Sequence, residues 1–135
     1  KNGVAYYIVN GGGDLFVNAP EPIEFALEDP RRTGRQLGST RIMRGALAAS
    51  STHKRTWRDG ETIRHHIINP RTNAPAVTSV AGTFVRAGSA LIADVMATVL
   101  IIRPDLELRL AEQYNLKTIL VTEQPSVTRK ISHTE

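Results

Sequence analysis

Two polar side chains on an otherwise apolar segment are the residues of this chain that best fit metal chemistry. Residues 90–102 are expected to form a helix that is apolar nearly all round and therefore buried, and its polar side chains are Asp94 and Thr98. Their spacing of four residues places them one turn apart on one helical face. A buried carboxylate is costly unless a cation or several donors compensate it, and a carboxylate with a hydroxyl supplies the hard oxygen ligands that magnesium takes. Magnesium binding and an Asp94 that pairs with an arginine or caps a loop are both open interpretations.

The glycines Gly11, Gly12 and Gly13 follow an expected strand and allow backbone amides to approach a ligand closely. No Gly-Lys-Ser/Thr follows them, so they are not a P-loop, and without a following helix they are not a dinucleotide-binding fingerprint. A hairpin turn is the plain alternative.

The histidines give a second, weaker signal. His65 and His66 lie where an expected strand ends, so that one ring points inward and the other outward. A single inward histidine is either a catalytic group or a hydrogen-bonded core residue. His53 and His133 have no evident partner, and the hydroxyl cluster Ser50-Ser51-Thr52 lacks the Gly-x-Ser-x-Gly pattern of a hydrolase nucleophile.

The elements that must position these residues are mostly short strands. Strands are expected at residues 4–10, 15–17, 23–27, 63–68, 79–85, 118–122 and 127–131. Residues 40–49 fit either a strand or a short helix, residues 29–39 a polar loop, and residues 105–114 a second, amphipathic helix. The sequence predicts a single α+β domain over residues 1–135, mainly an antiparallel sheet with one buried and one amphipathic helix.

Composition excludes several classes of protein. The 135 residues are 41% hydrophobic and 22% charged, which is typical of one globular domain. There are no cysteines, so disulfide scaffolds, zinc–thiolate sites and cysteine nucleophiles are excluded. The apolar run at residues 90–102 is shorter than the roughly 20 residues of a membrane span.

Charge is concentrated in the middle of the chain. Residues 31–71 hold ten basic and two acidic side chains, whereas residues 1–30 hold one basic and five acidic ones. This block favours a phosphate-bearing ligand or an anionic partner, and a solvated arginine-rich surface is the alternative. Nucleic acid is not the expected partner, because the block has one aromatic residue, Trp57, and no zinc-finger motif or recognition helix.

Four motifs follow one another along about residues 4–122. They are the turn Asn10, Gly12, Gly13, Asp14; the segment Ala49-Ser50-Ser51; the run His66-Ile67-Ile68-Asn69-Pro70-Arg71-Thr72, with Pro75; and the helix Ser89 to Thr98, which reads Ser-x-x-x-Ala-Asp-x-x-Ala-Thr. In type, order and spacing they resemble motifs of the ApbE-like family, the FAD:protein FMN transferases. Three departures occur: Asn69 replaces the usual Asp, Asn73 the usual Gly, and Ser51-Thr52 a Ser-Gly pair.

The resemblance covers only the carboxy-terminal part of the family's pattern. The family's amino-terminal half, with its Gly-rich segment and much of the flavin-binding surface, has no counterpart in this sequence. The resemblance therefore implies a piece of a longer protein, with the other part upstream or in a second chain, or a truncated relative. Family members are often periplasmic or membrane-anchored, and no signal or anchor is recognisable in the printed residues, so the location stays open.

The resemblance also implies an activity: magnesium-dependent transfer of FMN from FAD to a Thr or Ser hydroxyl of an acceptor flavoprotein, with release of AMP. Asp94 and Thr98 would bind Mg²⁺, and His66, as the inward histidine, would be the catalytic base or orienting group. The residues implied in FAD binding are Asn10, Gly12, Gly13, Asp14, Ser50 and Ser51. Two alternatives stand beside this one: magnesium-dependent hydrolysis of FAD to FMN and AMP, and a flavin-binding domain without activity.

Overall fold

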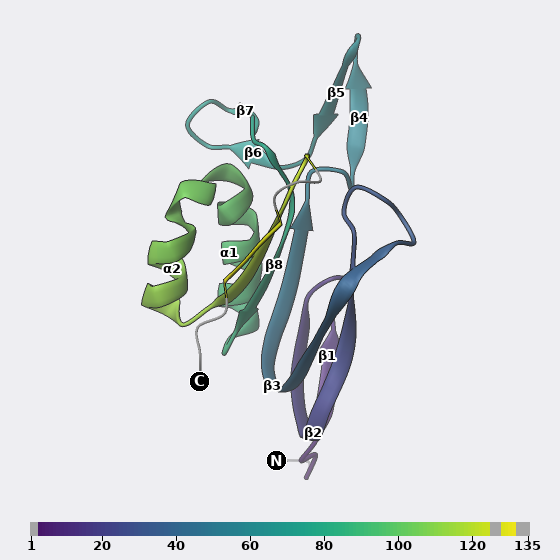
Figure 1. Ribbon diagram of the computed structural model, residues 1–135, viewed down its shortest axis with the longest axis vertical. Coiled ribbons are helices and arrows are strands. Elements are labelled where there is room, and N and C mark those ends of the chain that lie inside the picture. The colour runs from purple at the N-terminus through teal and green to yellow at the C-terminus, as the bar shows by residue number, and fades with distance from the viewer. Residues whose placement is uncertain (1–2, 125–127, 132–135) are drawn as a thin grey trace.

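Two helices pack on one face of a six-stranded antiparallel sheet in the computed structural model, which describes residues 3–124 and 128–131 (Figure 1). The strand order is β1-β2-β3-β8-β9-β10. The strands of this sheet are β1 (Tyr7–Asn10), β2 (Leu15–Glu28), β3 (Gln36–Ser51), β8 (Val80–Ala87), β9 (Lys117–Thr122) and β10 (Thr128–Ile131). Two small sheets pair β4 (Thr56–Asp59) with β5 (Thr62–His65) and β6 (Ile68–Asn69) with β7 (Ala74–Pro75). The helices are α1 (Ala90–Ile102), the 3₁₀ helix η1 (Pro104–Leu106) and α2 (Glu107–Tyr114).

The predicted α+β class and the mainly antiparallel sheet are confirmed, whereas several element boundaries differ. Residues 15–17 and 23–27, expected as two strands, belong to the single strand β2. The register of β2 against β3 shifts between Asn18 and Ile23. This irregularity takes Pro20 and Pro22 out of the ladder without ending the strand. Residues 40–49 are strand, and β3 begins at residue 36, so the polar loop is limited to residues 29–35. None of the described helices is long and apolar enough to cross a membrane.

The sheet has a hydrophobic core on each face. On one face, small residues of β3 such as Ala46 and Ala48 contact Ala93, Ala97 and Leu100 of α1, so helix and sheet approach closely. The small side chains explain why this helix lies directly on the centre of the sheet.

On the opposite face, the outer halves of β2 and β3 curl over the sheet, so that Leu27 and Ile42 join the cluster of Val17 and Phe84. Gly45 permits this bend. It has φ +119°, and a Cβ there would come within 2.8 Å of the Ala87 carbonyl oxygen, so this position of β3 requires glycine.

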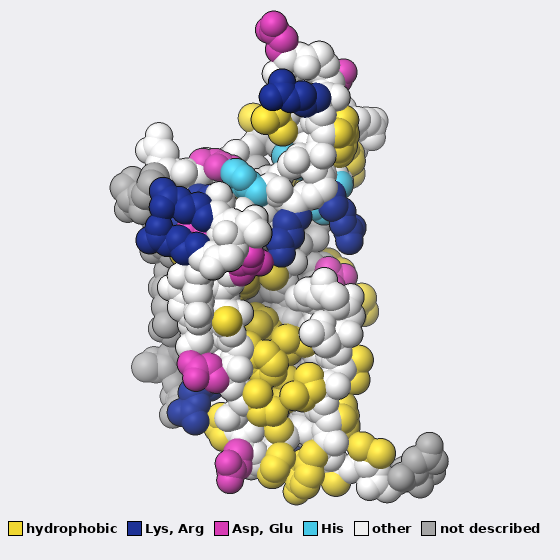
Figure 2. Space-filling view, turned by 90° about the vertical axis from the view of Figure 1, so that its right-hand side faces the viewer, with side chains coloured by type: hydrophobic (Ala, Val, Ile, Leu, Met, Phe, Trp, Pro, Cys, Tyr) yellow, Lys and Arg dark blue, Asp and Glu magenta, His cyan; other side chains and the backbone are white. Residues whose placement is uncertain are grey.

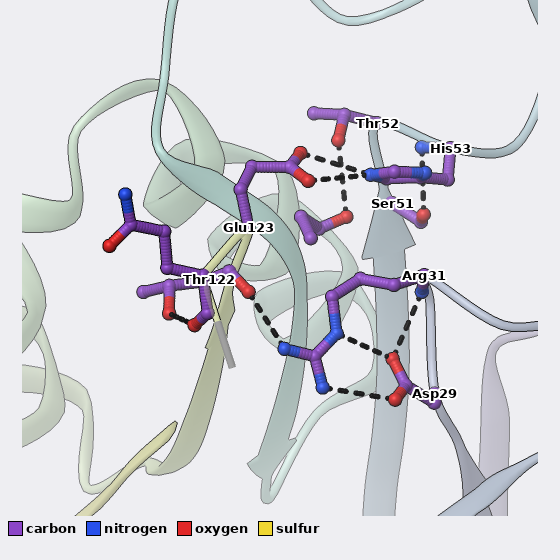
Figure 3. Close-up of polar contacts among 9 residues, drawn as sticks. Asp29, Arg31, Ser51, Thr52, His53, Thr122 and Glu123 are labelled. Carbon is purple, nitrogen blue, oxygen red and sulfur yellow. Dashed lines mark hydrogen bonds and ion pairs between the residues drawn. The ribbon is translucent and has the colours of Figure 1, made fainter. Parts of the chain in front are cut away.

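The loop of residues 29–35 fixes the end of this curled hairpin to the sheet. Pro30 lies against Gly82 of β8, where a Cβ would meet it at 2.8 Å. The Arg31 guanidinium donates to both carboxylate oxygens of Asp29, at 2.9 and 3.0 Å, and to the carbonyl oxygen of Thr122 at 3.0 Å (Figure 3). Asp29 is 3% exposed, and the hydrogen bonds from Arg31 hold its pKa at about 2, below the usual 3.8, although burial alone would raise it.

Asp29→Asn should therefore lower the free energy of unfolding by about 2–4 kcal/mol, because it leaves the half-buried Arg31 without its anion. The matched control is Asp105→Asn. Asp105 makes the same two-pronged pair with Arg103 at 2.8 and 2.7 Å, but its side chain is 58% exposed. There the loss of stability should be much smaller, because exposed pairs contribute little. Urea denaturation of both variants at pH 7 measures the difference.

The effect of Asp29 should depend on pH in a defined direction. A carboxyl whose pKa is lowered by folding stabilises the protein above its unfolded pKa, near 3.8, and this stabilisation disappears as the pH falls toward about 2. The gap between wild type and Asp29→Asn should thus be full at pH 6 and shrink between about pH 4 and pH 2. Equal losses for the Asp29 and Asp105 variants, or a gap that ignores pH, would contradict this role.

Candidate functional site

The turn between β1 and β2 presents an open surface. The Asn10 side-chain oxygen accepts the Gly12 N–H at 2.9 Å, and the Gly11 N–H donates to the Asp14 carbonyl oxygen at 2.8 Å. Gly12 and Gly13 have φ of +88° and +140°, and a Cβ on either would meet no atom within 4 Å. The turn is thus closed by its own hydrogen bonds and leaves room for a ligand against the two glycines.

Asp14, at the end of this turn, lies within electrostatic range of Asp94 on α1. Burial raises the pKa of the Asp14 carboxyl, and the like charge of Asp94 raises it further. A hydrogen bond with the Ala49 backbone acts in the opposite direction. The structure therefore brings together two carboxylates that are 80 residues apart in the sequence.

Two hydroxyl groups adjoin these carboxylates. The Ser50 and Thr98 hydroxyl oxygens are 3.1 Å apart and join the end of β3 to α1. α1 is also anchored to β8, because the Thr83 hydroxyl donates to the Ala97 carbonyl oxygen at 2.7 Å. We call Asp14, Ser50, Asp94 and Thr98 the Asp14–Asp94 cluster.

The helix that carries Asp94 is buried on one face only, which corrects the expectation of burial nearly all round. Ala93 and Leu100 face the sheet and are fully buried, whereas Leu91 and Val95 are 70% and 44% exposed. Asp94 lies on the exposed face. Apolar composition predicted burial of the whole surface, but the described residues cover only the side that packs on β3 and β8.

The donor set of the cluster fits magnesium. Two carboxylates and two hydroxyls are hard oxygen ligands, and Mg²⁺ commonly keeps further positions for water or phosphate oxygens. Within residues 3–124 and 128–131, no three His, Cys, Asp or Glu side chains gather into a metal-binding group, so a metal here would rely on hydroxyl oxygens or other ligands besides the two carboxylates.

The two neighbouring histidines differ from the sequence-based expectation. β5 ends at His65, so His66 lies outside the strand and simple alternation does not apply. His65 is the more buried ring: its Nδ1 accepts the Ile67 N–H at 3.3 Å, and its Nε2 is 3.1 Å from the Ala76 carbonyl oxygen. The His66 ring is exposed, with Nδ1 3.1 Å from the Lys54 carbonyl oxygen. The expectation that His66 is the inward histidine is therefore wrong for the described part of the chain.

These contacts assign the ring protons. A carbonyl oxygen only accepts, so His66 carries its proton on Nδ1 and, when neutral, keeps a lone pair on Nε2. In His65 both ring nitrogens are already engaged by the backbone. Of the two, only His66 has a nitrogen available to a substrate.

Ser51 lies apart from the cluster, because consecutive strand residues face opposite sides of a sheet. It is buried, and its hydroxyl accepts the backbone N–H of His53 at 3.0 Å. His53 does have a partner, contrary to the expectation: its Nε2 is 3.0 Å from both carboxylate oxygens of Glu123 (Figure 3). A separation of 70 residues gives no sequence signal for this pair. His133 is outside the described residues.

Two of the departures from the family pattern preserve the local backbone. Asn69 accepts the Arg71 N–H on its side-chain oxygen at 3.0 Å, as an aspartate would. Asn73 has φ +53°, a left-handed conformation that glycine adopts freely and asparagine tolerates. The turn after β6 therefore keeps a shape suited to the Asp and Gly that the family usually has.

Comparisons with known proteins agree with these motifs. The family model of the ApbE family matches residues 1–120. The solved ApbE protein of Thermotoga maritima is 22% identical with a TM-score of 0.79, over 93% of this chain and 42% of that one. The flavinyl transferase ApbE of Pseudomonas stutzeri is 24% identical with a TM-score of 0.73, over 95% of this chain and 42% of that one. The flavin transferase ApbE of Vibrio cholerae is 23% identical with a TM-score of 0.71, over 96% and 42%.

At these identities the solved structures show a shared fold, and the chain spans 42% of the length of each of the three. No curated protein matches the chain. The family model, in contrast, matches most of its sequence. The chain therefore belongs to the ApbE family.

Proposed function

We propose that this chain carries the metal-binding and base groups for magnesium-dependent transfer of FMN from FAD to a Thr or Ser hydroxyl of an acceptor flavoprotein. Family membership and the flavin transferase names of two solved relatives support flavin transfer in general. The observation that carries the finer proposal is the Asp14–Asp94 cluster, which combines two carboxylates and two hydroxyls beside the open Gly12-Gly13 turn.

The reaction breaks the diphosphate of FAD. The acceptor hydroxyl oxygen forms a bond to the phosphorus of the FMN half, and the bond from that phosphorus to the bridging oxygen breaks. AMP leaves with the bridging oxygen, and the hydroxyl proton passes to a base. Bound Mg²⁺ supplies charge neutralisation on the phosphate oxygens.

The residues divide this work between them. Asp94 and Thr98 would hold the metal, and Asp14 and Ser50 border the same space. Asn10, Gly12 and Gly13 would accommodate the flavin or phosphate, because their turn is open to an incoming group. His66 would accept the hydroxyl proton on Nε2, while its Nδ1–H donates to the Lys54 carbonyl oxygen. Ser51 is kept in the proposed set of FAD-binding residues, although its hydroxyl already accepts the backbone N–H of His53.

The chain also exposes an apolar surface against which another polypeptide segment could pack. Figure 2 shows hydrophobic side chains over the lower half of one face, where β1 and β2 lie in Figure 1. Exposed apolar residues of this region include Tyr6, Tyr7, Ile8 and Val9. β1 is also an edge strand of the sheet. An edge strand with exposed apolar side chains favours pairing with a strand of another polypeptide segment.

The 135 residues alone should therefore transfer FMN roughly 10²-fold or more slowly than a polypeptide or complex that supplies the rest of the ApbE fold, because positioning of the flavin is incomplete. Mass spectrometry of the acceptor after incubation with FAD and Mg²⁺ measures the attached FMN, and chromatography measures free FMN and AMP. Transfer by the purified 135-residue monomer at the rate of the completed fold would contradict the expectation. Free FMN and AMP without labelled acceptor would indicate FAD hydrolysis, and binding without turnover a flavin-binding domain.

A further inference from the structure

We propose a second binding site, for a mononucleotide-sized phosphate-bearing anion, in a cleft beside the β2–β3 loop. The residues that line this arginine cleft are Asp29, Arg31, Arg32, Arg35, Gln36, Leu37 and Glu123. Its volume of about 470 Å³ lies in the range of small-ligand pockets, roughly 300–1,000 Å³. The inference does not rest on the proposed transfer of FMN.

The cleft keeps a net positive charge, because its lining has three arginines and two acids, Asp29 and Glu123. Arg31 is fully engaged, since it donates to the two Asp29 oxygens and to the Thr122 carbonyl oxygen. No hydrogen bond or ion pair engages the guanidinium groups of Arg32 or Arg35 in the part of the chain that the structure describes. Glu123, the remaining acid of the lining, has both carboxylate oxygens directed to His53 (Figure 3). Two guanidinium groups thus remain available to an anion.

The backbone holds these two arginines in place. The Arg32 N–H donates to the Asp29 carbonyl oxygen at 3.1 Å, and the Arg35 N–H donates to the Arg32 carbonyl oxygen at 3.1 Å. The Asp29 N–H closes the loop by donating to the Arg35 carbonyl oxygen at 2.6 Å. Gly34, at φ +79°, donates its N–H to the Glu28 carboxylate at 2.9 Å. A loop ordered before binding loses less entropy when a ligand arrives, so the arginines are presented in advance.

The lining suits a nucleotide better than an acidic polypeptide. Guanidinium groups bind phosphate oxygens in a two-pronged geometry and also stack on flat rings. Leu37 adds an apolar side chain. The Gln36 Nε2 donates to the Gly38 carbonyl oxygen at 2.9 Å, so its amide oxygen is the group left to accept from a base or sugar. The volume of this cleft suits one such ligand, whereas an acidic peptide would need an extended groove.

The arginine cleft is separate from the Asp14–Asp94 cluster. Pro30 packs on Gly82, and Leu27 before the loop belongs to the core on the sheet face opposite α1. Thr98 and Ser50 meet on the α1 side. A ligand in the cleft would therefore lie on the other side of the sheet from the proposed metal.

The test is calorimetric titration of the 135-residue chain with uridine monophosphate in about 0.1 M salt without Mg²⁺. The variant R32A/R35A removes both available guanidinium groups. The matched control R41A/R44A removes two exposed arginines from β3 of the same hairpin, outside the cleft lining. Affinity should fall at least tenfold in R32A/R35A and stay within twofold in R41A/R44A, and uridine should not bind.

Each other outcome overturns the inference. If uridine monophosphate does not bind to the wild type, the proposed site does not exist. Equal losses of affinity in R32A/R35A and R41A/R44A would mean that the anion is attracted by the overall charge and not by the cleft. Tighter binding of a glutamate peptide than of uridine monophosphate would assign the cleft to an acidic polypeptide. Asp94→Asn should leave the affinity unchanged, so a failure of the transfer proposal is seen separately in FMN labelling. Melting temperatures of the variants within about 2 °C of the wild type would show that lost binding is not lost folding.

Discussion

Asp94→Asn is expected to reduce magnesium-dependent FMN transfer by roughly 10²–10³-fold in the completed fold, while the chain remains folded. The amide keeps the shape of the side chain but removes the negative charge that a hard cation requires. Asp94 is exposed, and its side chain makes no hydrogen bond within the described residues, so its replacement should change the free energy of unfolding by no more than about 0.5 kcal/mol. Activity and folding are thus expected to separate.

The measurement is the rate of acceptor labelling as a function of Mg²⁺ concentration, with the melting temperature of each variant. Glu112→Gln, on the exposed side of α2, is the control, since it removes one carboxylate from a neighbouring helix away from the cluster. Asp94→Ala should lose at least as much activity as Asp94→Asn. Unchanged magnesium affinity in both Asp94 variants, measured by calorimetry on the completed protein, would contradict the assignment of Asp94 as a metal ligand.

The sequence predicted the elements whose signals are local. The helix at residues 90–102 was predicted to its observed bounds, because a long apolar run lies between Gly88-Ser89 and Arg103-Pro104. The turn at residues 10–14 and the strand at 117–122 also carry local signals, from glycines and β-branched residues. The spacing of Asp94 and Thr98 followed from helical periodicity alone.

Features that depend on distant pairing were not predictable. Prolines at positions 20 and 22 indicated a break, but β3 holds both halves of β2 in one strand. The Arg31–Thr122 and His53–Glu123 contacts join residues 91 and 70 positions apart. Apolar composition also cannot tell which side of α1 is covered, because that depends on what packs against it.

The histidines show the same limit more sharply. Alternation assigns opposite faces only to residues that share a strand, and the end of β5 at His65 leaves His66 outside it. The family signature selected His66, and the hydrogen bonds of both rings make the choice testable.

His66→Ala should cut FMN transfer by roughly 10²–10⁴-fold, the range of a lost general base, with FAD affinity changed little. The base would be Nε2, since Nδ1 donates to the Lys54 carbonyl oxygen. Because the ring is exposed and makes one backbone hydrogen bond, its removal should have a small effect on stability. His65→Ala is the matched neighbour, with the opposite expected profile: it loses contacts to Ile67 and Ala76 and should lower the melting temperature, with activity per folded molecule close to wild type.

Rates of acceptor labelling at saturating FAD, normalised to the folded fraction from thermal melting, decide between a base and a residue that only supports its loop. Equal losses for the two histidines, or a His66→Ala defect that cooling repairs, would mean that His66 supports its loop. His66→Asn sharpens the result, because the asparagine Nδ2 occupies the place of Nδ1 and can still donate to the Lys54 carbonyl oxygen but cannot take a proton. If the asparagine variant keeps the stability of the wild type but not its rate, proton transfer at Nε2 is the function of His66.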